Sequence, residues 1–81
     1  MRLDKYLKNA RLIKRRTVAN EACDNEHVVV NGKSAKASYQ VKVGDIIEIG
    51  YGARSIKVEV LDTEEHTGKA SALLMYREVA Q

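Results

Sequence analysis

The spacing of apolar residues changes partway along this chain, and that change most narrows the folds it can adopt. Near the N-terminus, apolar side chains recur at the three- and four-residue steps of one helix face, at Leu3, Tyr6, Leu7 and Ala10. A second, narrower stripe of small apolar residues predicts another helix from about Arg16 to Cys23. Asp24-Asn25-Glu26 then favours a turn, and apolar residues alternate at every second position beyond it. Two helices followed by strands indicate an α+β fold.

The strongest strand signal is Asn31-Gly32, which directly follows the alternating Val28 and Val30. Both turn residues accept the positive φ that a two-residue turn of type I′ requires, so a β-hairpin is expected here. Alternating runs at 39–43, 46–49 and 56–60 predict further antiparallel strands, with a turn at Gly44-Asp45. A polar loop is expected at 64–68, and helical spacing within 69–79 predicts a short C-terminal helix.

We expect a single domain over residues 1–81, because a chain of 81 residues has room for one compact core. Its composition, 44% hydrophobic and 31% charged, is that of an ordinary globular protein. No apolar run approaches the roughly 20 residues that cross a bilayer, so we expect a cytoplasmic protein without membrane contact. We also expect a monomer. Cys23, the single cysteine, is expected to pack as a small core residue.

The sequence offers little from which to build an enzyme active site. Its two histidines and one cysteine show no spacing that would close a zinc site. Gly44-Asp45 lacks the glycine-rich neighbours of a phosphate-binding loop and is interpreted as a turn. His27 is interpreted as an exposed residue between helix and strand rather than as a phosphate ligand. We therefore expect no catalytic residue, no metal ion and no cofactor.

Positive charge is concentrated at the N-terminal end. Residues 1–16 hold seven basic residues against a single Asp, a net charge of +6, whereas residues 17–32 carry −3 and the remainder is balanced. Exposed Lys and Arg often have no binding role and simply form the water-facing side of a helix. Here Lys14, Arg15 and Arg16 cluster at the start of the second helix, where like charges repel unless a polyanion binds. Guanidinium groups and helix N-termini both bind phosphate, so the cluster predicts contact with an RNA backbone.

The candidate RNA contacts are the basic residues of this segment and one hairpin lysine: Arg2, Lys5, Lys8, Arg11, Lys14, Arg15, Arg16 and Lys33. Asp4 joins them as the residue that orients the basic side chains at the start of the first helix, where its carboxylate also meets unsatisfied N–H groups. Arg16 is taken to be exposed, so its removal should weaken RNA binding but cost little stability. Recognition should follow RNA shape rather than sequence.

Five short stretches occur in one order along the chain: R-L-D-K-Y-L, A-R-L, R-R-T-V-A, V-V-V-N-G and V-K-V-G-D-I-I-E-I. From Arg2 to about Ile49 they resemble the ribosomal protein S4-type RNA-binding domain, or alpha-L motif. The resemblance implies two helices packed on a small antiparallel sheet, with the helix pair facing structured RNA. The positions that match the family's R-L-D-K, S-R-x-x-A and V-N-G patterns are Arg2, Asp4, Lys5, Arg16, Ala19, Asn31 and Gly32.

The chain departs from the family pattern at two positions. Arg15 stands where a Ser often caps the second helix, and Glu26 stands where Gly is common before the first strand. A domain this short resembles a stand-alone bacterial group of ribosome-associated quality-control factors and ribosome-binding heat-shock proteins. That likeness implies binding to large-subunit ribosomal RNA and tRNA on stalled subunits, with a quality-control protein as a further partner.

Two other functions stay open at this point. S4-type domains often adjoin pseudouridine synthase or tRNA synthetase domains, so one alternative is a detached RNA-specificity module of an RNA-modifying enzyme. The other is a protein-interaction adaptor that uses the strand surface at 46–60, with the basic helix keeping the protein soluble. Charge reversal at Arg16 would leave partner binding intact in such an adaptor.

Overall fold

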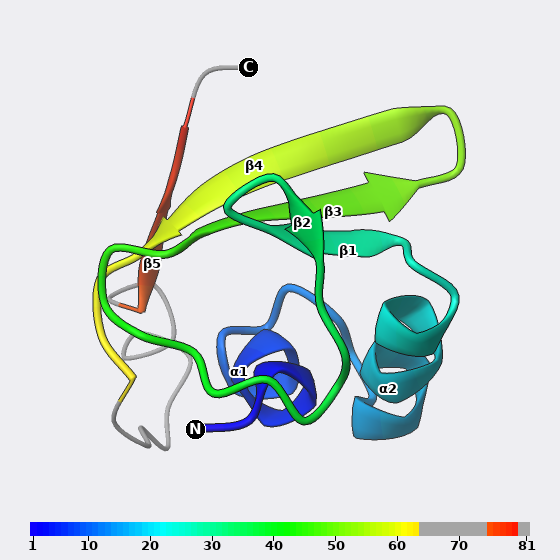
Figure 1. The fold of residues 1–81 in the computed structure, drawn as a ribbon, viewed down its shortest axis with the longest axis horizontal. Helices are drawn as coiled ribbons and strands as arrows, with labels where there is room; N and C mark the ends of the chain where they lie inside the picture. The colour runs from blue at the N-terminus through cyan, green and yellow to red at the C-terminus, as the bar shows by residue number, and fades with distance from the viewer. Residues whose placement is uncertain (64–74, 80–81) are drawn as a thin grey trace.

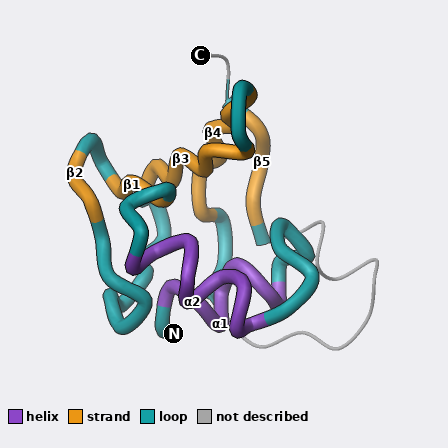
Figure 2. Tube along the Cα trace, turned by 90° about the vertical axis from the view of Figure 1, so that its right-hand side faces the viewer, coloured by secondary structure: helices purple, strands orange, loops and turns teal. Residues whose placement is uncertain are grey.

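The described residues, 1–63 and 75–79 of this computed structural model, form two layers (Figure 1). One layer holds helices α1 (Leu3–Asn9) and α2 (Arg16–Asp24). The other is an antiparallel sheet in the order β2-β1-β3-β4-β5, built from β1 (Val28–Val30), β2 (Lys33–Ser34), β3 (Ile46–Tyr51), β4 (Arg54–Val60) and β5 (Tyr76–Glu78). Both helices cover the same face of the sheet (Figure 2). The expected α+β class, with two N-terminal helices on an antiparallel sheet, is confirmed.

The core fills the space between the two layers. Leu3, Tyr6 and Leu7 on one face of α1 are fully buried, as their helical spacing predicts. From the sheet, Ile47 of β3 lies opposite Val58 of β4 in the strand register, and both are fully buried. Each Å² of apolar surface removed from water contributes roughly 25 cal/mol, so this contact is the main force that holds the helices on the sheet.

Cys23 of α2 is a core residue, as predicted. It is buried, and burial raises the pKa of its thiol to about 11, with the charges of Asp4 and Asp24 adding to the effect. The thiol is therefore protonated at neutral pH and acts as a small apolar side chain.

The hairpin turn forms where the sequence predicts it, between β1 and β2. Asn31 and Gly32 both have positive φ, 53° and 82°, as a two-residue hairpin turn requires. The Asn31 side chain also reaches the second turn: its Nδ2 donates to the Asp45 carboxylate at 3.0 Å, and its Oδ1 accepts the Ile46 N–H at 3.0 Å. The interpretation of Gly44-Asp45 as a turn is confirmed, and the buried Asp45 carboxylate ties the two turns together.

The segment between β2 and β3 wraps around the start of α1. Its carbonyls accept the N–H groups of Leu3 and Asp4, at 2.8 and 3.2 Å, which a helix N-terminus leaves without an intrahelical partner. The alternating run at 39–43 is therefore not a strand of the sheet. It makes one isolated bridge, between Arg2 and Gln40, because its backbone groups serve the N-terminal end of the chain instead.

The predicted C-terminal helix is wrong where the structure describes it. The end of that segment is strand β5, which pairs with β4; the stretch 69–74 and the predicted loop at 64–68 lie outside the described residues. Tertiary contacts, rather than the helical spacing of apolar residues, decide the structure of this segment. The open edge of β4 offers backbone partners, and the Tyr6 hydroxyl of α1 donates to the Met75 carbonyl at 2.5 Å.

Helix α2 ends in a left-handed residue that is not glycine. Glu26 has φ 62°, and its N–H donates to the Cys23 carbonyl at 3.1 Å, while the next N–H, of His27, donates to the Ala22 carbonyl at 2.8 Å. These bonds form a Schellman motif, whose left-handed position is usually Gly. Asn25, a residue type that tolerates the left-handed conformation, instead has φ −91°. The departure from Gly at position 26 thus falls on a backbone conformation that disfavours a side chain.

Replacing Glu26 with Gly should raise the free energy of unfolding by about 1 kcal/mol, because Gly adopts the left-handed conformation without a Cβ clash. Urea denaturation followed by circular dichroism measures this change. The matched control is Glu21→Gly inside α2, where the same substitution should lower stability by about 1 kcal/mol. Equal destabilisation by both variants would show that position 26 carries no backbone strain.

Candidate nucleic-acid interface

One carboxylate, that of Asp4, joins the two helices. It is only 2% exposed, although it lies in the first turn of α1. Its Oδ1 accepts the Lys5 N–H at 2.8 Å and Nε of Arg2 at 3.2 Å. Its Oδ2 accepts Nε of Arg16 at 3.3 Å and Nδ2 of Asn20 at 3.4 Å, both from α2. These donors satisfy both oxygens, as a buried charge requires. We call Asp4 and its donors the Asp4 cluster.

The bonds of the Asp4 cluster keep its carboxylate ionised. Burial opposes the charge, but hydrogen bonds from Asn20, Arg16 and the Lys5 N–H, with the Arg16 charge, outweigh burial and hold the pKa of Asp4 below its ordinary value of 3.8. Asp4 is therefore a fixed negative charge at neutral pH. The expected contact between this carboxylate and a first-turn N–H of the helix is confirmed by the bond from Lys5.

The two arginines of the Asp4 cluster lie at the starts of the two helices. Arg2 is the N-cap of α1, and Arg16 is the first residue of α2. Their side chains are fixed through Nε yet remain 45% and 50% exposed. Holding a long side chain in place beforehand lowers the entropy lost when it binds an anion. Arg16 is exposed, as predicted, but its bond to a buried carboxylate leads us to expect a larger stability cost on its removal than exposure alone suggests.

The connection between the helices presents further positive charge. Arg11 is left-handed, with φ 60°, and its N–H and the next one donate to carbonyls in the last turn of α1, each at 3.0 Å. This second Schellman motif fixes the turn. Arg15 occupies the N-cap of α2 without a side-chain cap bond, at the position where the family pattern has Ser. The exposed basic residues on and beside the connection are Lys8, Arg11, Lys14 and Arg15.

Not every candidate residue lies on this surface. Lys5 is half-buried, although its N–H belongs to the Asp4 cluster. Lys33 lies on β2, in the sheet layer, beside Lys36 along an open hollow of about 610 Å³. The structure thus gathers the N-terminal candidates around the helices and leaves Lys33 on a separate part of the molecule.

Two residues that the sequence did not mark as candidates contribute polar or charged groups to these surfaces. Asn20 gives Asp4 a neutral donor, and its place four residues after Arg16, on the same face of α2, is the signal that could have found it. Lys36 adds a second ammonium group to the hollow beside Lys33. No periodic pattern marks Lys36, because the segment after β2 wraps around the start of α1 and is not a strand of the sheet.

A metal site and a membrane-spanning helix are both absent from the part of the chain that the structure describes. Among residues 1–63 and 75–79, no group of three His, Cys, Asp or Glu side chains is placed to hold a metal ion. Every buried side-chain N or O atom in these residues has a hydrogen-bond partner. No helix within the same residues is both long and apolar enough to cross a membrane.

The two-layer fold and its N-terminal helix pair define a class of protein. A family model described as the S4 domain matches residues 1–47, more than half of the chain. This stretch contains both helices and the hairpin of β1 and β2. The chain belongs to the S4 domain family, and the resemblance seen in its sequence motifs is confirmed.

Within that family, the chain is similar along its length to particular proteins. It is 47% identical over 81 residues to the RQC P-site tRNA stabilizing factor of Streptococcus pneumoniae, covering 100% of this chain and 92% of that protein. The Bacillus subtilis factor of the same name is 46% identical over 76 residues, covering 94% and 88%. Vibrio cholerae heat shock protein 15, solved as a trimer, has a TM-score of 0.90 at 32% identity, covering 99% of this chain and 82% of that one.

Asp4 should make the protein less stable in acid. Its pKa is lower in the folded chain than in the unfolded chain, so its contribution is present above about pH 4 and is lost as the pH falls through the folded value. Asp4→Asn should cost about 2 kcal/mol at neutral pH, because the charged acceptor becomes a neutral amide. Urea denaturation across a pH series should also show a weaker acid dependence in the variant.

Some acid dependence should persist in Asp4→Asn, because Asp45 also has a lowered pKa and is unchanged there. The informative quantity is therefore the difference between the two pH profiles. If wild type and variant lose stability in parallel below pH 4, the bonds around Asp4 do not stabilise its charged form.

Proposed function

We propose that this chain is a noncatalytic RNA-binding factor of ribosome-associated quality control, which binds stalled large ribosomal subunits and contacts their ribosomal RNA and P-site tRNA. The observation that carries the proposal is the exposed arginine pair held by Asp4. It occurs in a chain 47% identical along its length to a factor named for stabilising P-site tRNA. Stabilising a bound tRNA requires contacts that hold it in place and needs no reacting side chain.

The helix surface suits folded RNA through its phosphates. Guanidinium groups such as those of Arg2 and Arg16 present paired N–H donors to phosphate oxygens. Because Asp4 fixes both side chains, they bind at a set separation, which selects RNA shape rather than base sequence. The proposed contacts, oriented by Asp4, are Arg2, Lys5, Lys8, Arg11, Lys14, Arg15 and Arg16, with Lys33 as a further contact from the sheet layer.

A detached specificity module of an RNA-modifying enzyme is the less favoured alternative. The Streptococcus pneumoniae relative, matched over 92% of its length, is named for stabilising a tRNA and not for modifying one. A detached module would bind free structured RNA as well as it binds ribosomal particles. A quality-control factor would instead prefer large subunits that still carry peptidyl-tRNA.

Location and assembly follow from the same proposal. We place the protein in the cytoplasm because its proposed target is the ribosome. A monomer remains our prediction, although the Vibrio cholerae relative was solved as a trimer. One copy of the chain already contains the whole Asp4 cluster, so the proposed RNA surface needs no second copy.

Arg11→Gly should weaken binding to stalled large subunits about tenfold, the size of one lost charge-assisted phosphate contact. The variant should keep its fold, because Gly accepts the left-handed conformation that Arg11 already has. The measurement is cosedimentation with purified large subunits that carry peptidyl-tRNA. Empty large subunits and free structured RNA are run in parallel.

The matched control for this experiment is Arg54→Ala, which removes one exposed positive charge from β4 in the sheet layer. This control should sediment like wild type. Equal losses in both variants would mean that net charge alone drives binding. A preference for free structured RNA over large subunits that carry peptidyl-tRNA would favour the detached-module alternative.

A further inference from the structure

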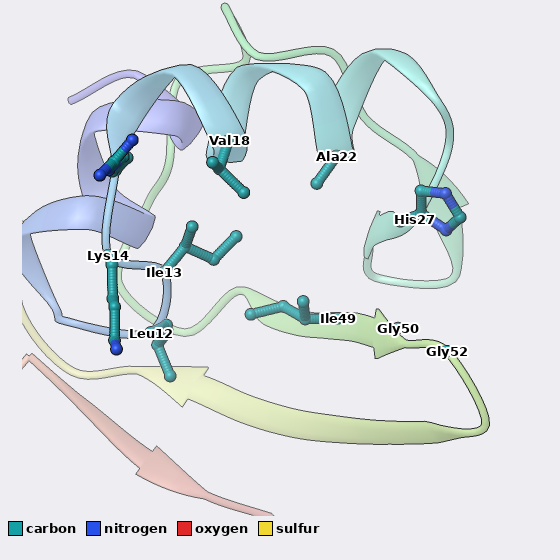
Figure 3. A pocket seen from close by; sticks show the side chains of 10 residues that line it. Leu12, Ile13, Lys14, Val18, Ala22, His27, Ile49, Gly50 and Gly52 are labelled. Atoms are coloured by element: carbon teal, nitrogen blue, oxygen red, sulfur yellow. The ribbon is translucent and has the colours of Figure 1, made fainter.

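A groove of about 630 Å³ lies between α2 and β3 (Figure 3). Val18 and Ala22 of α2 point into it toward Ile13 and Ile49. Ile13 and Ile49 belong to the core and form an aliphatic floor, whereas Val18 is 48% exposed. Folding of the described chain therefore leaves an apolar edge of α2 half open to solvent.

This groove lies on the opposite side of α2 from the Asp4 cluster. Successive helix residues point about 100° apart, so Arg16 and Asn20 share one direction and Val18 and Ala22 share another, roughly 200° away. The buried stripe of α2 lies between these two directions and faces the core. Helix α2 therefore has two accessible edges, one that holds the Asp4 carboxylate and one that borders the groove.

The lining of the groove favours a protein ligand over a nucleic acid. Its described residues include no Phe, Tyr or Trp, so His27 is the one aromatic ring in the lining that could stack on a base, and no side-chain amide or hydroxyl is present to bind a base edge. They also include no Asp or Glu, while Lys14, Arg15 and His27 are exposed, with Lys14 at one end of the groove and His27 at the other (Figure 3). An aliphatic floor beside two cationic residues is complementary to an apolar side chain flanked by carboxylates.

We propose that the groove binds a short amphipathic segment of a partner protein. Aliphatic side chains of that segment rest against Val18 and Ile49, and its acidic residues lie beside Lys14 and Arg15. The Asp4 cluster lies on the other edge of α2, so Arg2 and Arg16 stay available to RNA while the segment is bound, and the two ligands share only Lys14 and Arg15. The inference goes beyond the proposed ribosomal function and depends on the groove alone.

The test titrates a synthetic peptide, with leucines on one helical face and glutamates on the other, into the isotope-labelled chain and follows it by NMR. A peptide with lysines in place of the glutamates is the charge control. The acidic peptide should shift the signals of Val18, Ala22 and Ile49, and should bind about tenfold more tightly than the lysine peptide. Unchanged signals at these residues, or equal affinity for both peptides, would overturn the proposal.

Val18→Glu places a like charge in the groove and should weaken binding of the acidic peptide about tenfold. Glu is at least as good a helix former as Val, so α2 should persist. Val43→Glu, at an exposed valine in the turn before β3, is the matched control and should bind like wild type. Equal loss in both variants would count against the groove.

A structured RNA hairpin, added to the same labelled chain, separates this proposal from the RNA function. The RNA should shift the signals of Arg2 and Arg16 and leave Ile49, on the β3 side of the groove, unchanged. Shifts at Ile49 would assign the groove to nucleic acid and overturn the inference. RNA that fails to shift the arginine signals, while the acidic peptide still binds, would overturn the proposed function and support the groove.

Discussion

Asp4 can stay ionised between two helices only because four hydrogen bonds reach its carboxylate, two from the start of α1 and two from α2. Burying a charge without such partners is strongly unfavourable. The helices therefore cannot slide or separate without leaving this charge unsatisfied. The same bonds fix Arg2 and Arg16, so the packing of the helix pair and the shape of its cationic surface depend on one side chain.

Local signals in the sequence predict the local parts of the fold. Asn31-Gly32 locates the hairpin because positive φ is a property of those two residues, and it needs no distant partner. Strand β5 cannot be predicted in this way, since it exists through pairing with β4 and follows directly on Met75, whose carbonyl accepts the Tyr6 hydroxyl. The left-handed ends of the helices escape sequence analysis too, because Arg11 and Glu26 occupy positions where Gly is usual.

The candidate site is predictable in composition but not in arrangement. The basic residues are visible as a charge excess in residues 1–16, and Asp4 stands out within the family motif. That Asp4 is buried, and that Asn20 completes its hydrogen bonds, depends on the distance between α1 and α2, which no local pattern encodes. The groove beside Val18 likewise exists only once α2 packs over the sheet. Helix α2 therefore has a polar edge that binds the Asp4 carboxylate and an apolar edge that borders the groove.

RNA affinity of Asp4→Asn tests most directly whether Asp4 orients the arginines that bind RNA. Removing a carboxylate makes the protein more positive by one charge, so long-range electrostatics alone predicts tighter binding. The bonds around Asp4 predict binding about tenfold weaker, because Arg2 and Arg16 lose the acceptor that fixes them. Asp24→Asn, which removes an exposed carboxylate at the end of α2, should bind at least as tightly as wild type. Unchanged or tighter binding by Asp4→Asn would contradict the orienting role of this carboxylate.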